Sequence, residues 1–433
     1  MNWAVLFTIY LIILFALFLL GQKIAFCLGL TGIVGLIILD NPQAMQGFGL
    51  TVWNCVNSFE LTAVPMFIFM GEIVVICGLS DNFYKSASTW FGRVTGGFLQ
   101  TNIFSCAVFA AISGSSLATA AAIGSVSYPE LKNRGYDKKM ILGTLGGGGA
   151  LGIMIPPSIP LLIYGSLTQE SVTKLFMAGV IPGVLAAVLF AIYTYIRCKI
   201  SPSLAPEKGA RASLREKLAS FRGMLPFFIL ILIIMGGIYL GYTTATEAAG
   251  ISVIVALLLS LLYRTITWQK FITAVVNTVK SSCMIFFIVV GAQMLSYLIV
   301  RSDISRDLTQ FVINLHPSKT SFFLMICLVY LVLGCLMDGT SIVYLTIPIL
   351  FPLLQAMQID TLWFGVVLVA LIEIAMLTPP VGMNLFVLHG ITKDGTSLGT
   401  IIRGCAPYIL LYAFVIVLLI FFPGLATWLP STM

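Results

Sequence analysis

The sequence predicts an all-α polytopic membrane protein built from two inverted repeats, each with a re-entrant helix hairpin and a proline-broken helix. Three observations lead to this fold class. The composition suits a lipid environment, and three sequence landmarks occur in the same order in both halves. In addition, most lysine and arginine residues fall on one predicted side of the membrane.

The composition is too apolar and too poor in charge for a soluble domain. Of the 433 residues, 59% are hydrophobic and 9% are charged, whereas soluble domains carry about 25% charged residues. The first apolar run lacks the basic start and the cleavage site of a signal peptide, so we interpret it as a spanning helix. Judged by the roughly 20 residues that span a bilayer core, the crossings are expected near residues 3–21, 24–39, 61–79, 140–166, 175–196, 224–242, 245–263, 281–300, 361–388 and 406–428.

A basic segment separates the two halves. Residues 197–223 contain seven Lys and Arg residues and two Glu residues, which gives a net charge of +5. Short cytoplasmic loops of membrane proteins are rich in Lys and Arg, so we interpret this segment as a cytoplasmic linker. It joins a first repeat at 1–196 to a second at 224–433. No series of aromatic residues alternates with its cations to stack on bases, and we expect no nucleic-acid partner.

Three landmarks recur in the two halves. The spacing from Gly114 to Pro156 is 42 residues and that from Gly339 to Pro379 is 40, which indicates an internal duplication. The first half holds "SGSS" at 113–116, "IPPSIP" at 155–160 and "GVIP" at 179–182, and the second holds "DGTS" at 338–341, "TPPVGM" at 378–383 and "GCAP" at 404–407.

Each repeat is predicted to cross the membrane five times, so the second repeat enters from the opposite side. The segments near 100–128 and 320–357 are interpreted as re-entrant hairpins, which leave the membrane on the side they enter. The segments near 140–166 and 361–388 are interpreted as helices broken at their double prolines.

The positions of Lys and Arg agree with this topology. With the N-terminus and the C-terminus on the periplasmic side, 19 of the 23 Lys and Arg residues lie on the inner face, as the positive-inside rule predicts. The first hairpin then opens to the cytoplasm and the second to the periplasm. The four cations left outside are Lys174, Arg301, Arg306 and Lys319.

The hairpin tips and double prolines predict two binding sites. Interrupted helices in inverted repeats are typical of secondary transporters, whose sites lie near the bilayer midplane. Each double proline removes two amide donors and frees carbonyls one turn upstream, and such oxygens with hydroxyls suit Na⁺. A packing face of small residues is the alternative, but each tip recurs with a matching double proline. The predicted sodium or substrate ligands are Ser113, Gly114, Ser115, Ser116, Pro156, Pro157 and Ser158 in the first repeat, and Asp338, Gly339, Thr340, Ser341, Thr378, Pro379, Pro380, Gly382 and Met383 in the second.

Acidic residues within apolar runs are candidates for function. For Asp338, we favour a role in positioning the second tip or attracting a cation over a helix cap. For Glu72 and Glu373, we favour buried neutral partners or an interface over a direct role. Two isolated histidines are too few for a metal cluster, so we expect no transition metal and no cofactor besides the coupling ion.

No Lys or Arg lies near either tip or either double proline in the sequence. An anionic substrate would therefore be held by hydroxyls, amides and helix N-termini, with bound Na⁺ supplying positive charge. That arrangement would couple substrate binding to sodium binding.

Four motifs resemble signatures of the large membrane (M) subunit of tripartite ATP-independent periplasmic (TRAP) transporters, the DctM-like family. The likeness runs through nearly the whole chain. The motifs are "SGSSLATAAAIG" at 113–124, "GALGIMIPPSIPLLIYG" at 149–165, "MDGTSIVYLTIPILFP" at 337–352 and "LTPPVGMNLF" at 377–386.

The resemblance implies an elevator-type fold of the ion-transporter superfamily in a bacterial inner membrane. It implies Na⁺-driven symport of an organic acid anion, such as a C4-dicarboxylate, a sialic acid or a sulfonate, delivered by a periplasmic substrate-binding (P) protein. It also implies a small four-helix membrane (Q) subunit, which here would be a separate chain. One Na⁺ site would combine Ser113–Ser116 with Pro156–Ser158, and the other Gly339–Ser341 with Thr378–Gly382.

Three other functions remain to be compared with this one. A dicarboxylate/sodium symporter of the same superfamily would work without a binding protein. An ion channel would need a continuous polar pore with charged rings or a filter, and a membrane enzyme would need a catalytic set at membrane depth. The sequence shows neither of the last two features, so we interpret the chain as a transporter and not as an enzyme.

Overall fold

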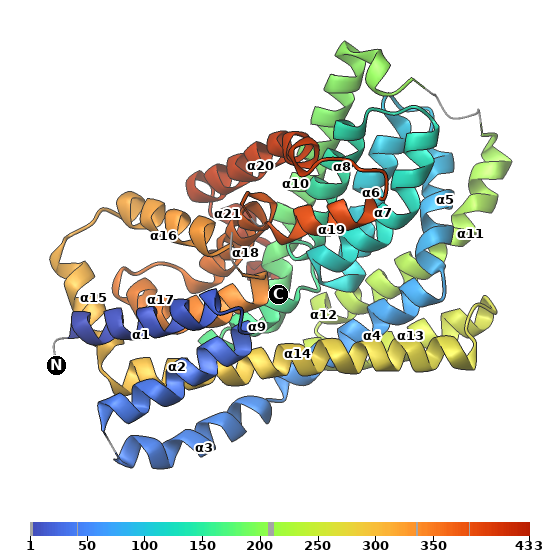
Figure 1. The fold of residues 1–433 in the computed structure, drawn as a ribbon. Helices are drawn as coiled ribbons and strands as arrows, with labels where there is room; N and C mark the ends of the chain where they lie inside the picture. The colour runs from blue at the N-terminus through green and yellow to red at the C-terminus, as the bar shows by residue number, and fades with distance from the viewer. Residues whose placement is uncertain (1–2, 41, 207–211, 335–336, 381) are drawn as a thin grey trace.

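The computed structural model describes residues 3–40, 42–206, 212–334, 337–380 and 382–433. Every regular element in these ranges is a helix (Figure 1), as the sequence predicts.

The N-terminal part contains two helices that the sequence does not predict. α3 interrupts its apolar run with Gln46, Thr51 and Asn54, and α5 is amphipathic, with residues such as Phe83 on its buried face. Neither has the continuous apolarity of a predicted crossing. The bounds are α1 (Trp3–Leu19), α2 (Ile24–Leu39), α3 (Pro42–Val56), α4 (Ala63–Ile76) and α5 (Leu79–Phe91).

The first predicted hairpin and the first broken helix are both present. The hairpin turns at Gly114, and Ser115 caps its second helix. The broken helix stops before its double proline and starts again after Ser158, which caps the second half. The hairpin consists of α6 (Gly97–Ser113) and α7 (Ser116–Asn133), the broken helix of α8 (Lys138–Gly149) and α9 (Ile159–Thr168), and α10 (Val172–Ile200) follows.

The second half repeats this order of elements. Asp338 caps the second helix of its hairpin, and its broken helix is interrupted around Pro379 and Pro380. The hairpin consists of α16 (Lys319–Gly334) and α17 (Gly339–Ala356), the broken helix of α18 (Thr361–Leu377) and α19 (Met383–Ile391), and α20 (Leu398–Phe421) follows, ahead of the short α21 (Gly424–Thr427).

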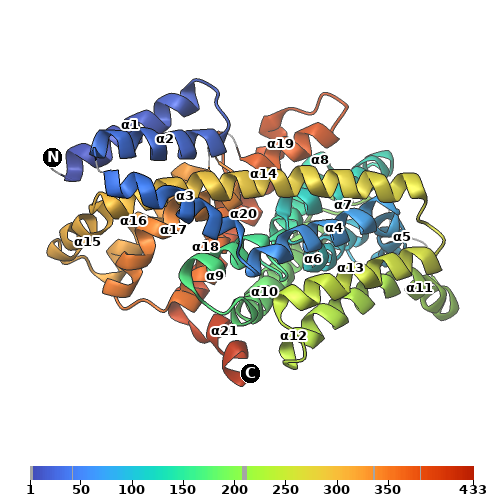
Figure 2. The same ribbon diagram turned by 90° about the horizontal axis from the view of Figure 1, so that it is seen from below.

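The helices that precede the second hairpin include one that runs along much of the molecule (Figure 2). Its 34 residues begin well before the predicted crossing near 281–300, because polar residues such as Lys270 and Asn277 lower the apolarity of its first turns. It packs against α2, α3, α4 and α17, as Figure 2 shows from below. These helices are α11 (Leu214–Ile231), α12 (Gly237–Tyr239), α13 (Ala245–Leu262), α14 (Trp268–Arg301) and the amphipathic α15 (Ile304–Asn314).

Six helices in the described ranges are long and apolar enough to cross a membrane, and the bent pair at 44–56 and 60–76 makes a seventh. Ten crossings are predicted from apolar runs. Four predicted crossings are not among them, because α1 and α2 are shorter than 18 residues and each broken helix is split into two short pieces. The count instead includes α17, which lies in the second predicted hairpin.

The two repeats pack into each other. α7 packs against α19, α8 against α20 and α9 against α17. Glycine allows the close approach of α8 to α20, because a Cβ at Gly143 would lie 2.3 Å from the carbonyl oxygen of Gly404. The core that results brings the first hairpin beside the second broken helix.

Candidate functional site

The first half-site is the tip of the α6–α7 hairpin together with the break between α8 and α9. Gly114 is the C-cap of α6 and has a φ of 60°. This is a left-handed conformation, which glycine adopts without strain. Ser115 caps the start of α7 and accepts a hydrogen bond from the Ala118 amide at 3.3 Å. The Ser113 hydroxyl lies 2.8 Å from that of Thr119. These hydroxyls are therefore held by the tip itself.

The first tip is bonded directly to the first broken helix. The Ile159 amide donates to the carbonyl oxygen of Gly114 at 3.3 Å. A Cβ at Gly114 would lie 2.8 Å from the Pro157 carbonyl oxygen, so only glycine fits this approach. Ser158 is buried and accepts from the Leu161 amide at 3.4 Å. The structure thus brings the predicted residues of this repeat together.

The second half-site is organised by one carboxylate. Asp338 accepts from the Thr340 amide at 3.1 Å and from the Ser341 amide at 3.3 Å. The hydroxyls of Thr340 and Ser341 also donate to the same carboxylate. Asp338 is therefore a helix cap, a role that we rank below positioning the tip on the sequence alone. The same hydrogen bonds also position the tip.

The second break is shaped by Thr378 and Gly382. Thr378 is extended and its hydroxyl donates at 2.6 Å to the Ile374 carbonyl, one of the groups that the break frees. Gly382 has a φ of 51° and precedes the first residue of α19. Pro379 and Pro380 are exposed.

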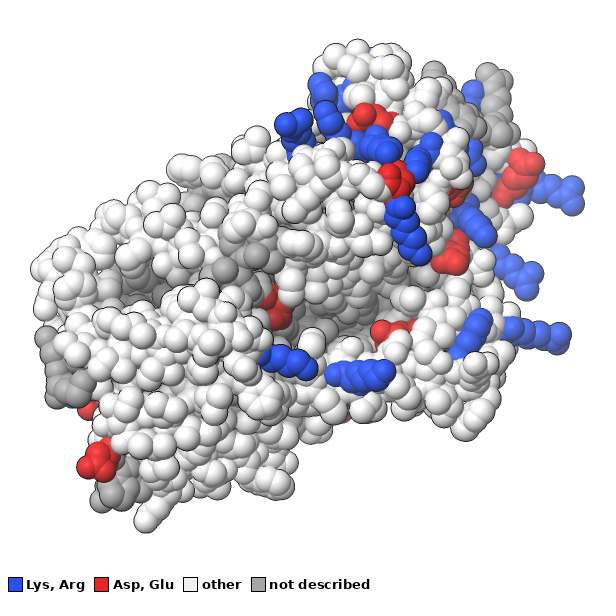
Figure 3. Space-filling view, in the orientation of Figure 1, with Lys and Arg blue, Asp and Glu red and all other residues white. Residues whose placement is uncertain are grey.

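Both tips face one cavity of about 970 Å³. Its other walls come from α2, α4 and α14, and Figure 3 shows a hollow on the same face of the molecule. The predicted ligands on its wall are Ser113, Gly114, Ser115, Ser116, Asp338, Gly339, Thr340 and Met383. The other predicted ligands do not line the cavity. They lie in the two breaks, except for Ser341, which is buried in the second tip.

Two charged residues of this cavity come from outside the tips. Glu72 of α4 accepts from the Asn277 side chain of α14 at 2.9 Å. Lys23, directly before α2, lines the same cavity as both tips. Lys23 therefore adds a cation to the cavity wall, although no Lys or Arg lies near the tips in the sequence. Lys23 is distant in sequence, and only the packing of α2 against α14 brings it to this wall.

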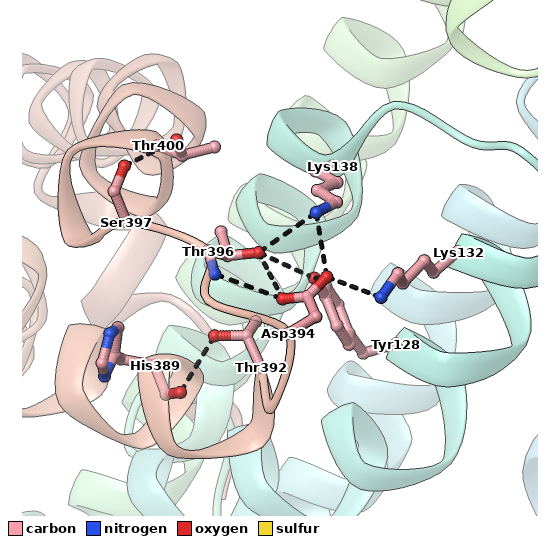
Figure 4. Close-up of polar contacts among 9 residues, drawn as sticks. All are labelled: Tyr128, Lys132, Lys138, His389, Thr392, Asp394, Thr396, Ser397 and Thr400. Carbon is pink, nitrogen blue, oxygen red and sulfur yellow. Dashed lines mark hydrogen bonds and ion pairs between the residues drawn. The ribbon is translucent and has the colours of Figure 1, made fainter.

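A second polar cluster joins the two repeats away from the cavity, and no sequence motif predicts it. Asp394, after α19, forms ion pairs with Lys132 of α7 at 2.7 Å and Lys138 of α8 at 2.9 Å. Tyr128 and Thr396 also donate to its carboxylate (Figure 4). Lys132, then Thr396 and Lys138, hold the pKa of Asp394 well below its usual range.

The sequence matches one family over nearly its whole length. A family model described as "Tripartite ATP-independent periplasmic transporter, DctM component" matches residues 11–425.

Curated relatives support the same assignment. The chain is 33% identical to the C4-dicarboxylate TRAP transporter large permease protein DctM of Pseudomonas aeruginosa, covering 93% of both. It is 29% identical to the sialic acid TRAP transporter large permease protein SiaM of Vibrio cholerae, covering 91% of this chain and 92% of that one. It is 32% identical to the isethionate TRAP transporter permease protein DctMQ of Oleidesulfovibrio alaskensis, covering 88% of this chain and 60% of that one.

One solved structure is similar in fold. The YdaH transporter of Alcanivorax borkumensis, reported to have an unusual topology, superposes with a TM-score of 0.63 at 16% identity. The match covers 89% of this chain and 90% of that one.

Proposed function

The chain belongs to the DctM component family of tripartite ATP-independent periplasmic transporters, and we propose that it couples inward Na⁺ movement to uptake of a small organic acid anion. The observation that supports this most directly is the pair of hairpin tips facing one cavity. Each tip exposes backbone and hydroxyl oxygens beside a proline-broken helix, which is the donor chemistry of a hard monovalent cation.

The proposed Na⁺ sites are the two half-sites. The first uses Ser113–Ser116 with Pro156–Ser158, and the second uses Gly339–Ser341 with Thr378–Gly382. Helix N-termini and bound Na⁺ would then hold the substrate carboxylate. Each net charge that moves inward through 100 mV is worth about 2.3 kcal/mol, so a surplus of Na⁺ over substrate charge would draw on the membrane potential.

The proposed movement is of elevator type. The two hairpins and two broken helices pack into each other across the repeats and form the unit that would move. α2, α4 and α14 form the facing wall of the cavity and would stay in place. The cavity lies between these two groups of helices, where a sliding movement would change its access.

The proposed location is a bacterial inner membrane. Both termini would lie in the periplasm and the basic end of the molecule in the cytoplasm. In Figure 3, Lys and Arg gather at the end of the molecule that holds α5, α7, α8 and α11. Residues 197–223 would connect the repeats on that side, although 207–211 lie outside the described residues.

The proposed partners are a small membrane subunit on a separate chain and a periplasmic substrate-binding protein. The chain covers 93% of the Pseudomonas DctM but 60% of the longer DctMQ. The substrate class spans the C4-dicarboxylate, sialic acid and isethionate that the names of the relatives specify.

The experiment is uptake into proteoliposomes that contain this chain, its small membrane subunit and its binding protein. The Na⁺ gradient and the membrane potential are varied, and a C4-dicarboxylate, a sialic acid and isethionate are compared. Uptake that needs both inward Na⁺ and the binding protein supports the proposal. Uptake that persists without the binding protein supports the two-part dicarboxylate/sodium symporter instead, and uptake indifferent to Na⁺ contradicts the proposed half-sites.

A further inference from the structure

The cavity wall that faces the two hairpin tips carries a carboxylate within an apolar helix. Glu72 lies in α4, in the stretch "FIFMGEIVV" at 67–75, and it lines the same cavity as both tips. The Asn277 side chain donates to its Oε2 at 2.9 Å, and no hydrogen bond from the described residues reaches its other oxygen. None of the ion pairs in the described ranges involves Glu72.

The contact with Asn277 does not explain the charge of Glu72. It links α4 to α14, but a neutral acceptor would make the same link. An acidic residue within a membrane helix is energetically costly and is therefore a candidate for function. Glu72 is half-buried, and its second oxygen is not among the enclosed polar atoms that lack a partner. That oxygen is therefore open to a ligand in the cavity.

Two other charged residues line this cavity in the described part of the chain. Asp338 is occupied by the amides and hydroxyls of its own tip. Lys23 is exposed, so solvent screens its charge more strongly than that of the half-buried Glu72. The far end of a substrate held at the tips therefore meets a negatively charged hydrogen-bond acceptor.

Charge, and not size, distinguishes the acids that the names of the relatives specify. A cavity of about 970 Å³ is large for a small-molecule site, so it has room for a C4-dicarboxylate, a sialic acid or isethionate. The second carboxylate of a dicarboxylate would face the carboxylate of Glu72, and like charges opposite each other disfavour a ligand. A hydroxyl at that place would donate a hydrogen bond to it.

We infer that Glu72 is a specificity-determining residue, which selects a monoanionic acid that carries a hydroxyl over a dicarboxylate. The acid group stays at the tips with Na⁺, and the hydroxyl donates to Glu72. An ammonium group does not serve in its place, because a zwitterion brings no net negative charge to balance the Na⁺ of the half-sites. The inference rests on the proposed function and narrows its substrate class.

The test is equilibrium binding of four acids, at saturating Na⁺, to the purified complex of this chain with the small subunit. The binding protein is left out because it selects ligands itself. Isethionate and ethanesulfonate differ by a hydroxyl at equal charge, and monomethyl succinate and succinate differ in charge at similar length. In the wild type, isethionate and monomethyl succinate should each bind more tightly than their partner, by about tenfold or more.

Two variants separate the charge of Glu72 from its hydrogen bond. E72Q removes the charge but keeps an acceptor and the contact with Asn277. It should reduce the preference for monomethyl succinate over succinate by about tenfold, while isethionate still binds more tightly than ethanesulfonate. E72L removes the acceptor as well, and both preferences should disappear.

A matched control is E247Q. Glu247 is exposed, does not line the cavity and forms a capping box with Thr244 at the start of α13. Glutamine serves equally in such a box, so both preferences should match those of the wild type.

Four outcomes would overturn the inference. One is wild-type binding of succinate as tight as that of its monoester, and another is a preference that E72Q leaves unchanged. The third is equal binding of isethionate and ethanesulfonate, and the fourth is the lack of measurable binding by either monoanion. If Na⁺ alters the binding of none of the acids, the proposed Na⁺ coupling fails, while the ratios within the two pairs still decide the role of Glu72.

Discussion

The two half-sites contain the same kinds of residue but are stabilised differently. In the first, the tip is bonded to the broken helix, from the Ile159 amide to the Gly114 carbonyl. In the second, the tip is held by its own Asp338, and Pro379 and Pro380 are exposed. The first half-site is therefore organised by contact between two elements, and the second by a cap within one element.

This difference determines which substitutions should matter most. A tip whose hydrogen bonds converge on one carboxylate is sensitive above all to that residue. A tip that is supported by a neighbouring helix is sensitive to the fit between the two, and less sensitive to any single hydroxyl.

The largest effect is expected for D338A. Asp338 accepts from two amides and two hydroxyls of the second tip, and hydrogen bonds to a charged group contribute about 1.5–3 kcal/mol each. Na⁺-dependent uptake should fall by about a hundredfold or more, since roughly 1.4 kcal/mol corresponds to a factor of ten. The measurement is initial uptake rate against Na⁺ concentration.

The matched control for D338A is S115A in the first tip. Ser115 caps α7 through one hydrogen bond, at 3.3 Å, and loss of such a cap costs about 1 kcal/mol. Its uptake should fall by roughly tenfold at most, because the Ile159 bond still supports the tip. Equal losses in the two variants would remove the distinction between the half-sites.

The second largest effect is expected for G114A. Gly114 has a φ of 60°, and its new Cβ would lie 2.8 Å from the Pro157 carbonyl. The left-handed conformation alone costs about 1–2 kcal/mol for a residue with a Cβ, and the collision with backbone adds to this. Half-saturation by Na⁺ should rise by about tenfold or more.

G382A provides the comparison in the second repeat. Gly382 also has a positive φ, but its Cβ would meet the flexible Leu385 side chain at 2.8 Å and the Thr378 carbonyl at 3.0 Å. A flexible side chain can move, so G382A should be milder than G114A. A more severe defect in G382A would show that the second break is the tighter of the two.

The sequence predicts the parts of each half-site well and the links between them poorly. Gly114, the serines and the double prolines have local consequences, since a turn, a cap and a missing amide act within one or two turns of helix. The hairpins and broken helices therefore follow from short motifs. The cap at Asp338 is equally local, although its four bonds appear only in the structure.

What the sequence could not supply depends on distant segments meeting. Lys23 reaches the cavity only through the packing of α2, and Asp394 meets Lys132 and Lys138 only because α7 and α8 pack near the end of α19. Helices α3 and α5 were missed for a different reason. Their polar faces are covered or solvated in the folded chain, and an apolar-run criterion excludes them.

A smaller effect is expected for D394N, which weakens the polar contact between the two repeats. The change leaves Lys132 and Lys138 facing each other without the carboxylate, at partly exposed positions where such pairs contribute about 0.2–1 kcal/mol. The thermal midpoint should fall by a few degrees and maximal uptake by about threefold, with no change in Na⁺ half-saturation. A changed Na⁺ dependence would show that the contact shapes a half-site directly.

The effect of D394N should not vary with pH in the physiological range. Because the pKa of Asp394 is lowered in the folded chain, its stabilising contribution is present above the usual carboxyl pKa of about 3.9. It is lost only as pH falls below that value toward the folded pKa. The difference in midpoint between wild type and D394N should therefore be constant from about pH 6 to pH 8. A difference that disappears within this range would contradict the lowered pKa.

The smallest effect is expected for K23Q, outside both half-sites. Lys23 lies on the cavity wall beside α2, is exposed, and adds positive charge where an anion would enter or leave. Loss of one exposed charge should raise the half-saturating substrate concentration by about threefold, more for a dianion than for a monoanion, and more at low ionic strength. Na⁺ half-saturation should not change, because Lys23 belongs to neither tip. If K23Q instead abolishes uptake at every substrate concentration, the wall contributes to the binding site itself, and the two half-sites are not sufficient to hold the anion.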